Sequence, residues 1–262
     1  MEKLRTFVKK PIPPSTFLNP VPVVMVSCRG NTDGYEKNNI ITIAWAGTVN
    51  SDPPMLSVSI RKSRYSHAQI SQTKEFVVNL VHQELLTSCD YCGVKSGSDI
   101  DKFEACSLTA EKAEGLDFAC AIAESPISIS CKVRQVIELG SHDMFIAEIV
   151  AVSVAENLYD YKGKIKVNDA GLVVYSHGEY FSLKGPDGFF GFSVAKPEVL
   201  TRRMPKPPKP STPEKKRKAY PKAKIEKKAT MEQKPVSEKK ATIEQKPLSN
   251  KKAALKLKKK KY

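Results

Sequence analysis

A run of cations and hydroxyls follows a predicted strand in the first quarter of the chain. Arg61-Lys62-Ser63-Arg64-Tyr65-Ser66-His67 comes directly after the alternating segment 55–60. Guanidinium, ammonium and hydroxyl groups are the donors that bind a phosphate through charge-assisted hydrogen bonds. If Ser66 caps the helix that follows, the N-terminal amides of that helix add further donors and a favourable dipole. The run therefore predicts an anion site, although a solvated turn with a capped helix has the same composition.

Hydrophobic pattern and turn residues define the elements that position this run. Residues 40–49 are rich in β-branched and small side chains and contain Trp45, the single tryptophan of the sequence. Asp52-Pro53-Pro54 ends that strand, because proline has no N–H for a sheet ladder. Met55–Ile60 then alternates apolar side chains with two serines, which predicts a strand with one apolar face. The cationic run thus lies between a strand and a helix.

Predicted strands dominate the first 195 residues. We expect strands at 21–28, 40–49, 55–60, 75–81, 127–139, 144–154 and 171–175, with a short helix at 83–91. The two long runs flank Gly140-Ser141-His142-Asp143, which has the form of a hairpin turn. Many strands with few short helices predict a mainly β fold closed into a barrel.

The order of several short motifs resembles the flavin-reductase-like family of FMN-binding split β-barrels, close to the flavoredoxins. The matching segments are Asn19-Pro20-Val21-Pro22-Val23, Thr42–Thr48, Asp52–Leu56, Arg61–Ser66, Phe76–Leu80, SGSDIDKFE at 96–104 and GSHDMFIAEIV at 140–150. Each motif alone is weak, but their order is specific, and the resemblance covers roughly residues 10 to 190.

The resemblance implies bound FMN, with its phosphate on the cationic run and its ring beside the strand that holds Trp45. The implied contacts are Arg61, Lys62, Ser63 and Ser66 at the phosphate, Tyr65 at the ribityl chain or ring edge, and Thr42, Ala44, Trp45, Thr48, Ser59, Asn79 and Lys102 elsewhere. For four of these residues a purely structural role stays open. Trp45 also fits a core aromatic, Thr42 and Asn79 fit polar strand positions, and Lys102 fits the start of a helix.

His142 is the one ionisable side chain that the resemblance places beside the ring, and it is the candidate catalytic residue. A histidine in a hairpin turn is the alternative. The function needs no acid–base pair, since a flavin itself carries hydride or electron chemistry. No G-x-G-x-x-G follows a predicted strand, so any NAD(P)H has to bind over the flavin.

These inferences predict an FMN-binding oxidoreductase that takes reducing equivalents from NAD(P)H or from a redox protein. A second hypothesis is a flavoredoxin-like electron-transfer flavoprotein with a redox-protein partner. A third, from another class, is a non-catalytic binding protein whose basic tail does the work. The family usually dimerises with FMN near the subunit interface, so the resemblance also implies a homodimer.

Cys89-Asp90-Tyr91-Cys92 has the spacing of half a zinc site or of a redox pair. Zinc would need two more ligands, and the sequence has neither a second C-x-x-C nor an H-x-x-x-H. We therefore predict no metal site and favour a structural role for these cysteines, with redox activity left open.

Charge divides the sequence near residue 195. Residues 1–195 contain 19 Lys+Arg and 22 Asp+Glu, whereas residues 196–262 contain 24 and 6, within a total net charge of +15. The second region repeats KKATMEQKPVSE from Lys227 as KKATIEQKPLSN from Lys239. Such a composition cannot build a core, so we predict a flavin-binding domain at 1–195 and a disordered basic tail at 196–262. The tail either contacts nucleic acid or an anionic surface non-specifically, or is a solubilising appendage.

We recognise no targeting signal in the sequence. The sequence has no run of about 18 apolar residues, and its first residues lack the apolar core of a signal peptide. Six scattered cysteines fit reduced thiols better than a disulfide framework. We expect a cytoplasmic protein without a membrane span.

Overall fold

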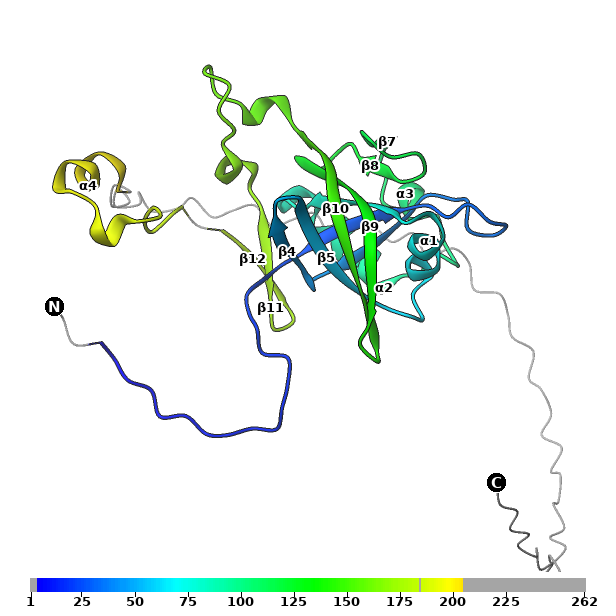
Figure 1. Ribbon diagram of the computed structural model, residues 1–262, viewed down its shortest axis with the longest axis horizontal. Coiled ribbons are helices and arrows are strands. Elements are labelled where there is room, and N and C mark those ends of the chain that lie inside the picture. Colours follow the sequence, from blue (N-terminus) through cyan, green and yellow to red (C-terminus); the bar gives the residue numbers. More distant parts are fainter. Residues whose placement is uncertain (1–3, 184, 205–262) are drawn as a thin grey trace, which may run out of the picture. The chain divides into compact units, whose positions relative to one another are not determined.

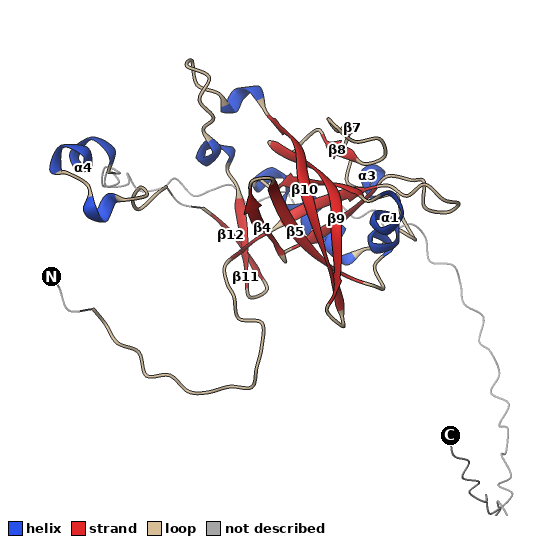
Figure 2. Ribbon diagram, viewed as in Figure 1, coloured by secondary structure: helices blue, strands red, loops and turns tan. Residues whose placement is uncertain are grey.

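Strands form most of the regular structure of this protein. The computed structural model describes residues 4–183 and 185–204, and the elements of this part follow the course drawn in Figure 1. Figure 2 shows long strands such as β9 and β10 crossing the others, with the short helices α1 and α3 beside them. The predicted mainly β fold with a few short helices is confirmed.

One antiparallel sheet of seven strands is the centre of the fold. Its spatial order is β3 (Asn39–Ile43), β2 (Val24–Cys28), β6 (Glu75–Leu80), β9 (Ile127–Glu138), β10 (His142–Val154), β5 (Pro54–Arg61) and β4 (Ala46–Ser51). The two edge strands, β3 and β4, are joined in the chain only by Ala44 and Trp45. The sheet must therefore curl until its edges meet, which makes a barrel that is split between β3 and β4.

The split corrects one boundary of the sequence analysis. Residues 40–49 were expected to be one strand, but the chain turns out of the ladder at Ala44 and Trp45. Only the Trp45 carbonyl continues the pairing, by accepting a hydrogen bond from the Ser59 amide at 3.0 Å. Trp45 consequently points away from the core, and 47% of its surface is exposed.

Two small sheets and the helices α1, α2 and α3 lie against the barrel. The small sheets are β1 (Val21–Pro22) with β11 (Val173–Ser176) and β12 (Glu179–Ser182), and β7 (Ala110–Lys112) with β8 (Cys120–Ile122). The α-helices are α1 (Tyr65–Thr73), α2 (Leu86–Val94), α3 (Lys102–Ala105) and α4 (Pro197–Arg203). Short 3₁₀ turns lie at Gln83–Leu85, Glu156–Leu158, Val167–Ala170 and Phe192–Val194.

Helix α4 lies where the sequence analysis expected the start of a disordered tail. Its sequence suits a helix, since Pro197 stands in the first turn and Arg202 and Arg203 complement the dipole in the last turn. The remainder of the predicted tail, from residue 205, lies outside the described residues.

The core of the barrel follows from strand alternation. On β5, Leu56, Val58 and Ile60 are buried while their neighbours face outward. On β10, Phe145 and Ala147 are buried in the same cluster, and β10 pairs with both β5 and β9. The predicted β9–β10 hairpin around Gly140 is confirmed, and Gly140 adopts the positive φ of 86° that favours glycine there.

No helix within the described parts of the chain has both the length and the apolar character that a membrane crossing requires.

Candidate functional site

Two adjoining cavities lie on either side of the loop that joins β5 to α1. The strand cavity, about 420 Å³, is lined by Val23, Ile41, Thr42, Ile43, Ala44, Trp45, Ser59, Ile60, Arg61, Arg64, His142, Tyr175 and Tyr180. The loop cavity, about 500 Å³, is lined by Ile41, Arg61, Ser63, Arg64, Tyr65, Ser66, Cys92, Lys95, Ser96, Gly97 and Lys102. Because Ile41, Arg61 and Arg64 line both, a single elongated ligand can reach from one cavity into the other.

The loop cavity is cationic. Arg61, Arg64, Lys95 and Lys102 line it together with three serines, and none of its described lining residues is acidic. The cations come from two separate segments, the cationic run and the 95–102 segment that ends in α3. Two arginines with hydroxyls and ammonium groups around one hollow are suited to a phosphate dianion.

The N-terminus of helix α1 faces the loop cavity. The helix begins at Tyr65, and Arg64 is its N-cap residue without a side-chain capping bond. This corrects the expected cap at Ser66, which lies inside the first turn. The correction leaves the dipole argument intact, because the first-turn amides near Tyr65 and Ser66 still have no partners within the helix.

Ser66 is held as a donor by a buried amide network. Its Oγ accepts a hydrogen bond from Asn39 Nδ2 at 2.8 Å, which leaves the hydroxyl proton for a ligand in the loop cavity. Asn39 Nδ2 also donates to Gln69 Oε1 at 3.0 Å, so its orientation is fixed. Gly97 covers the other side of this amide, where a Cβ would lie 2.1 Å from Asn39 Oδ1. The wall of the cavity can therefore accept only glycine at that position.

Lys102 is a buried cation in the wall of the loop cavity. Only 3% of its surface is exposed, and its Nζ donates to the carbonyls of Ile40 at 2.6 Å and Cys92 at 2.8 Å. Burial lowers the pKa of this ammonium group from its ordinary value. The two carbonyls tie α3 to β3 and to α2, so Lys102 supports the cavity as well as charging it.

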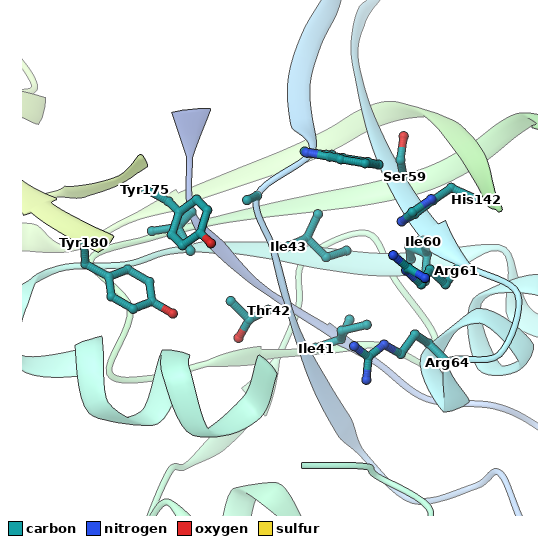
Figure 3. A pocket seen from close by; sticks show the side chains of 13 residues that line it. Ile41, Thr42, Ile43, Ser59, Ile60, Arg61, Arg64, His142, Tyr175 and Tyr180 are labelled. Atoms are coloured by element: carbon teal, nitrogen blue, oxygen red, sulfur yellow. The ribbon is translucent and has the colours of Figure 1, made fainter. Parts of the chain in front are cut away.

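The strand cavity is lined mainly by aromatic and aliphatic side chains, with two arginines at the end that it shares with the loop cavity. The Trp45 ring lies beside the His142 ring with centroids 4.6 Å apart and planes at 45°. Figure 3 shows His142, Arg61 and Arg64 on one side of β3, with Tyr175 and Tyr180 on the opposite side. A flat conjugated ring system fits between such walls, since aromatic side chains offer large rigid contact areas.

His142 is neutral near neutral pH. Burial and the nearby Arg61 guanidinium both lower its pKa. Its Nδ1 is 2.9 Å from the Ser141 hydroxyl, and its position on β10 is opposite Arg61 on β5. A neutral imidazole can donate or accept one hydrogen bond but supplies no fixed charge to the strand cavity.

Sequence reasoning missed Tyr175 and Tyr180, which the β11–β12 hairpin brings to the strand cavity. Their rings meet edge to face at 5.5 Å, and the Tyr180 hydroxyl donates to Asp90 Oδ1 at 2.9 Å. Arg64, Lys95, Ser96 and Gly97 were also left out of the predicted site. Their signals were present, because Arg64 stands in the cationic run and Ser96-Gly97 begins the SGSDIDKFE motif.

Most predicted side chains are brought together. Thr42, Ala44, Trp45, Ser59, Arg61 and His142 line the strand cavity, while Arg61, Ser63, Tyr65, Ser66 and Lys102 line the loop cavity. Two of them are already engaged by the fold, since Thr42 donates to the Cys89 carbonyl of α2 and Tyr65 donates to the Gly34 carbonyl. Thr48 lies in a third hollow, about 640 Å³, between β4 and residues 15–18.

Two predicted residues lie outside these three hollows. Asn79 is fully buried, where its Nδ2 donates to Met25 O and Ser27 Oγ and its Oδ1 accepts from the Ile122 amide. This network satisfies an amide inside the barrel and leaves none of it for a ligand. Lys62 turns away from the loop cavity, toward Glu138 at 2.6 Å and Asp143 at 3.4 Å.

The cysteines of the C-x-x-C segment lie on the buried face of α2. Burial raises the pKa of both the Cys89 and the Cys92 thiols to about 12, so neither is a thiolate at neutral pH. The sulfur neighbour of Cys92 is Cys106, at 3.9 Å. Within the described residues, no three His, Cys, Asp or Glu side chains are grouped as metal ligands.

Comparison with known proteins identifies the family of most of the described residues. The family model of the flavin reductase like domain matches residues 17–184. This range includes the cationic run, both cavities and every motif from Asn19 onward.

Solved structures share the fold over most of the chain. Flavoredoxin of Desulfovibrio vulgaris (Miyazaki F) is 30% identical, with a TM-score of 0.65 over 72% of this chain and 100% of that chain. Flavoredoxin from Methanosarcina acetivorans is 27% identical, with a TM-score of 0.64 over 71% of this chain and 96% of that chain. Among curated proteins, the NADH:riboflavin 5'-phosphate oxidoreductase of Streptomyces pristinaespiralis is 20% identical over 53% of this chain and 72% of its own length.

Proposed function

Because the chain belongs to the flavin reductase like family, we propose that it is an oxidoreductase that binds FMN across the two cavities and takes electrons from NAD(P)H or from a redox protein. The observation that carries the proposal is the sharing of Ile41, Arg61 and Arg64 by a cationic and an aromatic cavity. FMN has the same division, with a phosphate at one end and a flat ring at the other.

The loop cavity would hold the phosphate. Arg61 and Arg64 supply guanidinium donors, Ser63 and Ser66 supply hydroxyls, and the first turn of α1 adds a favourable dipole. Lys95 and Ser96 face the same space from the opposite segment. Lys62 is left out of this set, because its ammonium group pairs with Glu138 and Asp143.

The strand cavity would hold the ring. Trp45, Tyr175 and Tyr180 give it apolar walls, and the backbone at Ala44 would be accessible to the ring because the alanine side chain is small. Bound flavin would supply the hydride or electron transfer, which no side chain of this chain provides. The role of His142 is to orient a polar edge of the ring or of a nicotinamide by one hydrogen bond, since its pKa is lowered and the imidazole is neutral.

A second candidate function is electron transfer without a nicotinamide substrate. The similarity to two flavoredoxins favours it, and the open strand cavity with its half-exposed Trp45 gives a protein partner access to the ring. The two functions differ in what reduces the flavin, so reduction kinetics separate them.

The test is an absorbance spectrum of the purified protein, before and after incubation with FMN, followed by anaerobic addition of NADH or NADPH. An oxidoreductase that uses nicotinamide shows a flavin spectrum that bleaches rapidly with one of the two donors. A flavoprotein that bleaches with dithionite but only slowly with either nucleotide supports electron transfer from a protein. Absence of a flavin spectrum after reconstitution contradicts both, and leaves the non-catalytic binding protein.

A further inference from the structure

The side chains of the cationic run point in two directions. Arg61, Ser63 and Arg64 line the cavities, but Lys62 and His67 face the opposite way, toward Asp143 on β10. His67 Nε2 is 2.8 Å from Asp143 Oδ2, and Lys62 Nζ is 3.4 Å from Asp143 Oδ1. One carboxylate therefore contacts a residue at the start of the run and a residue in the first turn of α1.

Asp143 is an unusual residue for its position. It lies on the face of β10 that also carries Phe145 and Ala147, and only 7% of its side chain is exposed. A carboxylate on the core face of a strand is costly unless charged partners and hydrogen bonds compensate it. Asp143 Oδ1 makes no hydrogen bond among the described residues, and its counter-charge is the Lys62 ammonium group.

The surroundings make this contact rigid. Asp143 is opposite Ile60 on β5 and Glu138 on β9, so its backbone is fixed from both sides. The His67 ring also meets the Phe145 ring edge to face at 5.1 Å. Burial raises the pKa of the Asp143 carboxyl, but His67 and Lys62 outweigh this effect and hold the pKa below its ordinary value. The carboxylate is therefore charged at neutral pH.

We propose that Asp143 is a positioning residue for the flavin phosphate: by holding Lys62 and His67 together, it fixes both ends of the loop whose other side chains line the loop cavity. Without that anchor, the three cations that the run places within four residues would face no buried opposing charge, and only the exposed Glu138 would still pair with Lys62. The loop would then spread, and Arg61 and Arg64 would lose the geometry in which both reach one phosphate. The inference takes FMN as the ligand from the proposed function. The contact of Asp143 with Lys62 and His67 does not depend on that function.

The experiment compares Asp143→Asn with wild type in apo protein titrated with FMN and with riboflavin, which lacks the phosphate. Asn keeps the shape of the side chain and removes its charge. We expect the Kd for FMN to rise about tenfold more than the Kd for riboflavin, because only FMN carries the phosphate whose charged hydrogen bonds would be misaligned. The matched control is Glu138→Gln, which removes the other partner of Lys62 from a side chain that is 76% exposed and should leave the ratio unchanged. If Asp143→Asn fails to fold, Lys62→Met at an exposed position takes its place. We expect this variant to change the FMN-to-riboflavin ratio by a smaller factor of about threefold.

A second measurement does not depend on flavin. Hydrogen exchange of the apo protein should show faster exchange at the amides of Arg64 and His67 in Asp143→Asn, because these amides close the turns of the loop. An FMN-to-riboflavin ratio equal to wild type, with unchanged exchange at the loop, overturns the anchor. If wild type binds neither flavin, the proposed function fails, and the exchange result alone decides whether Asp143 holds the loop.

Discussion

The two cavities differ in how they are built. The loop cavity takes its charge from the cationic run and from residues 95–102, two short segments of the chain. The strand cavity is assembled from β3, β5, β10 and the β11–β12 hairpin, segments spread over more than a hundred residues. The comparison teaches that charge at this site is encoded locally, whereas the shape of the ring pocket exists only after the barrel has formed.

This difference has an energetic counterpart. In the FMN complex that we propose, contacts of the loop cavity would act on the phosphate and weaken with salt, because they are electrostatic. Contacts of the strand cavity would act on the ring through area and packing, and salt would change them little. The ratio of FMN affinity to riboflavin affinity therefore measures the loop cavity, and riboflavin affinity alone measures the strand cavity.

The largest effect is expected when both shared arginines are removed. Arg61→Ala with Arg64→Ala should raise the Kd for FMN about 100-fold, since at least two charge-assisted hydrogen bonds are lost. Riboflavin has no phosphate, so its Kd should change by less than about threefold. Titration calorimetry of the apo proteins measures both values.

The control for this prediction is Arg134→Ala, which removes an arginine that pairs with Glu148 and lines neither cavity. Equal losses for FMN and riboflavin in the double variant would show that the arginines hold the ring rather than the phosphate. In that case the division between the cavities would be wrong.

Replacing Lys102 tests whether its charge stabilises the fold or binds the ligand. Lys102→Met leaves the carbonyls of Ile40 and Cys92 without a donor inside the protein. We expect the free energy of unfolding of the apo protein to fall by about 2 kcal/mol, the cost of unsatisfied buried polar groups. Urea denaturation measures it, with Lys95→Met as the control on the same cavity. Equal stability of the two variants would mean that Lys102 is not part of the framework.

Replacing Trp45 tests a side chain of the strand cavity that should bind the ligand without stabilising the fold. Because the side chain is half-exposed at the split of the barrel, Trp45→Ala should leave the stability of the apo protein nearly unchanged. The Kd values for FMN and riboflavin should both rise about tenfold, which is the scale of aromatic packing on a ring. Fluorescence titration gives both values, and a change confined to FMN would contradict the placement of the ring beside Trp45.

Local patterns of the sequence were sufficient for the fold and the family. Alternation on β5 and the glycine between β9 and β10 identified a mainly β body, and the motif order identified the family, which the match over residues 17–184 confirms. Each of these features depends on residues close together in the chain. The anion site at the cationic run stays a prediction, since its residue types also fit a solvated turn and only the cavity that they line supports it.

Features that depend on tertiary packing were not predictable. The break at Ala44 and Trp45 arises because the edges of the sheet must meet, and no local signal marks it. Asn79 has the sequence context of a ligand contact, but buried partners from β2 and β8 engage its amide. Tyr175 and Tyr180 reach the strand cavity only through the pairing of β11 with β1. The homodimer, the protein partner and the role of the basic tail stay predictions.

The smallest effects concern pH, where His142 in the strand cavity and Asp143 beneath the loop between β5 and α1 should respond in separate ranges. The pKa of His142 in the strand cavity is lowered by burial and by Arg61, so below about pH 6.5 the unfolded chain takes up a proton before the folded protein does. Stability is therefore lost as the pH falls from about 6.5, and His142→Gln should remove this loss. The pKa of Asp143 is also lowered, and its contribution is present above about pH 3.9 and is lost as the pH falls further. Urea unfolding of the apo protein at pH 7.5, 5 and 3.5 should show wild type losing stability relative to His142→Gln in the first interval and relative to Asp143→Asn in the second. If both differences change in the same interval, His142 and Asp143 titrate as one network and are not electrostatically separate.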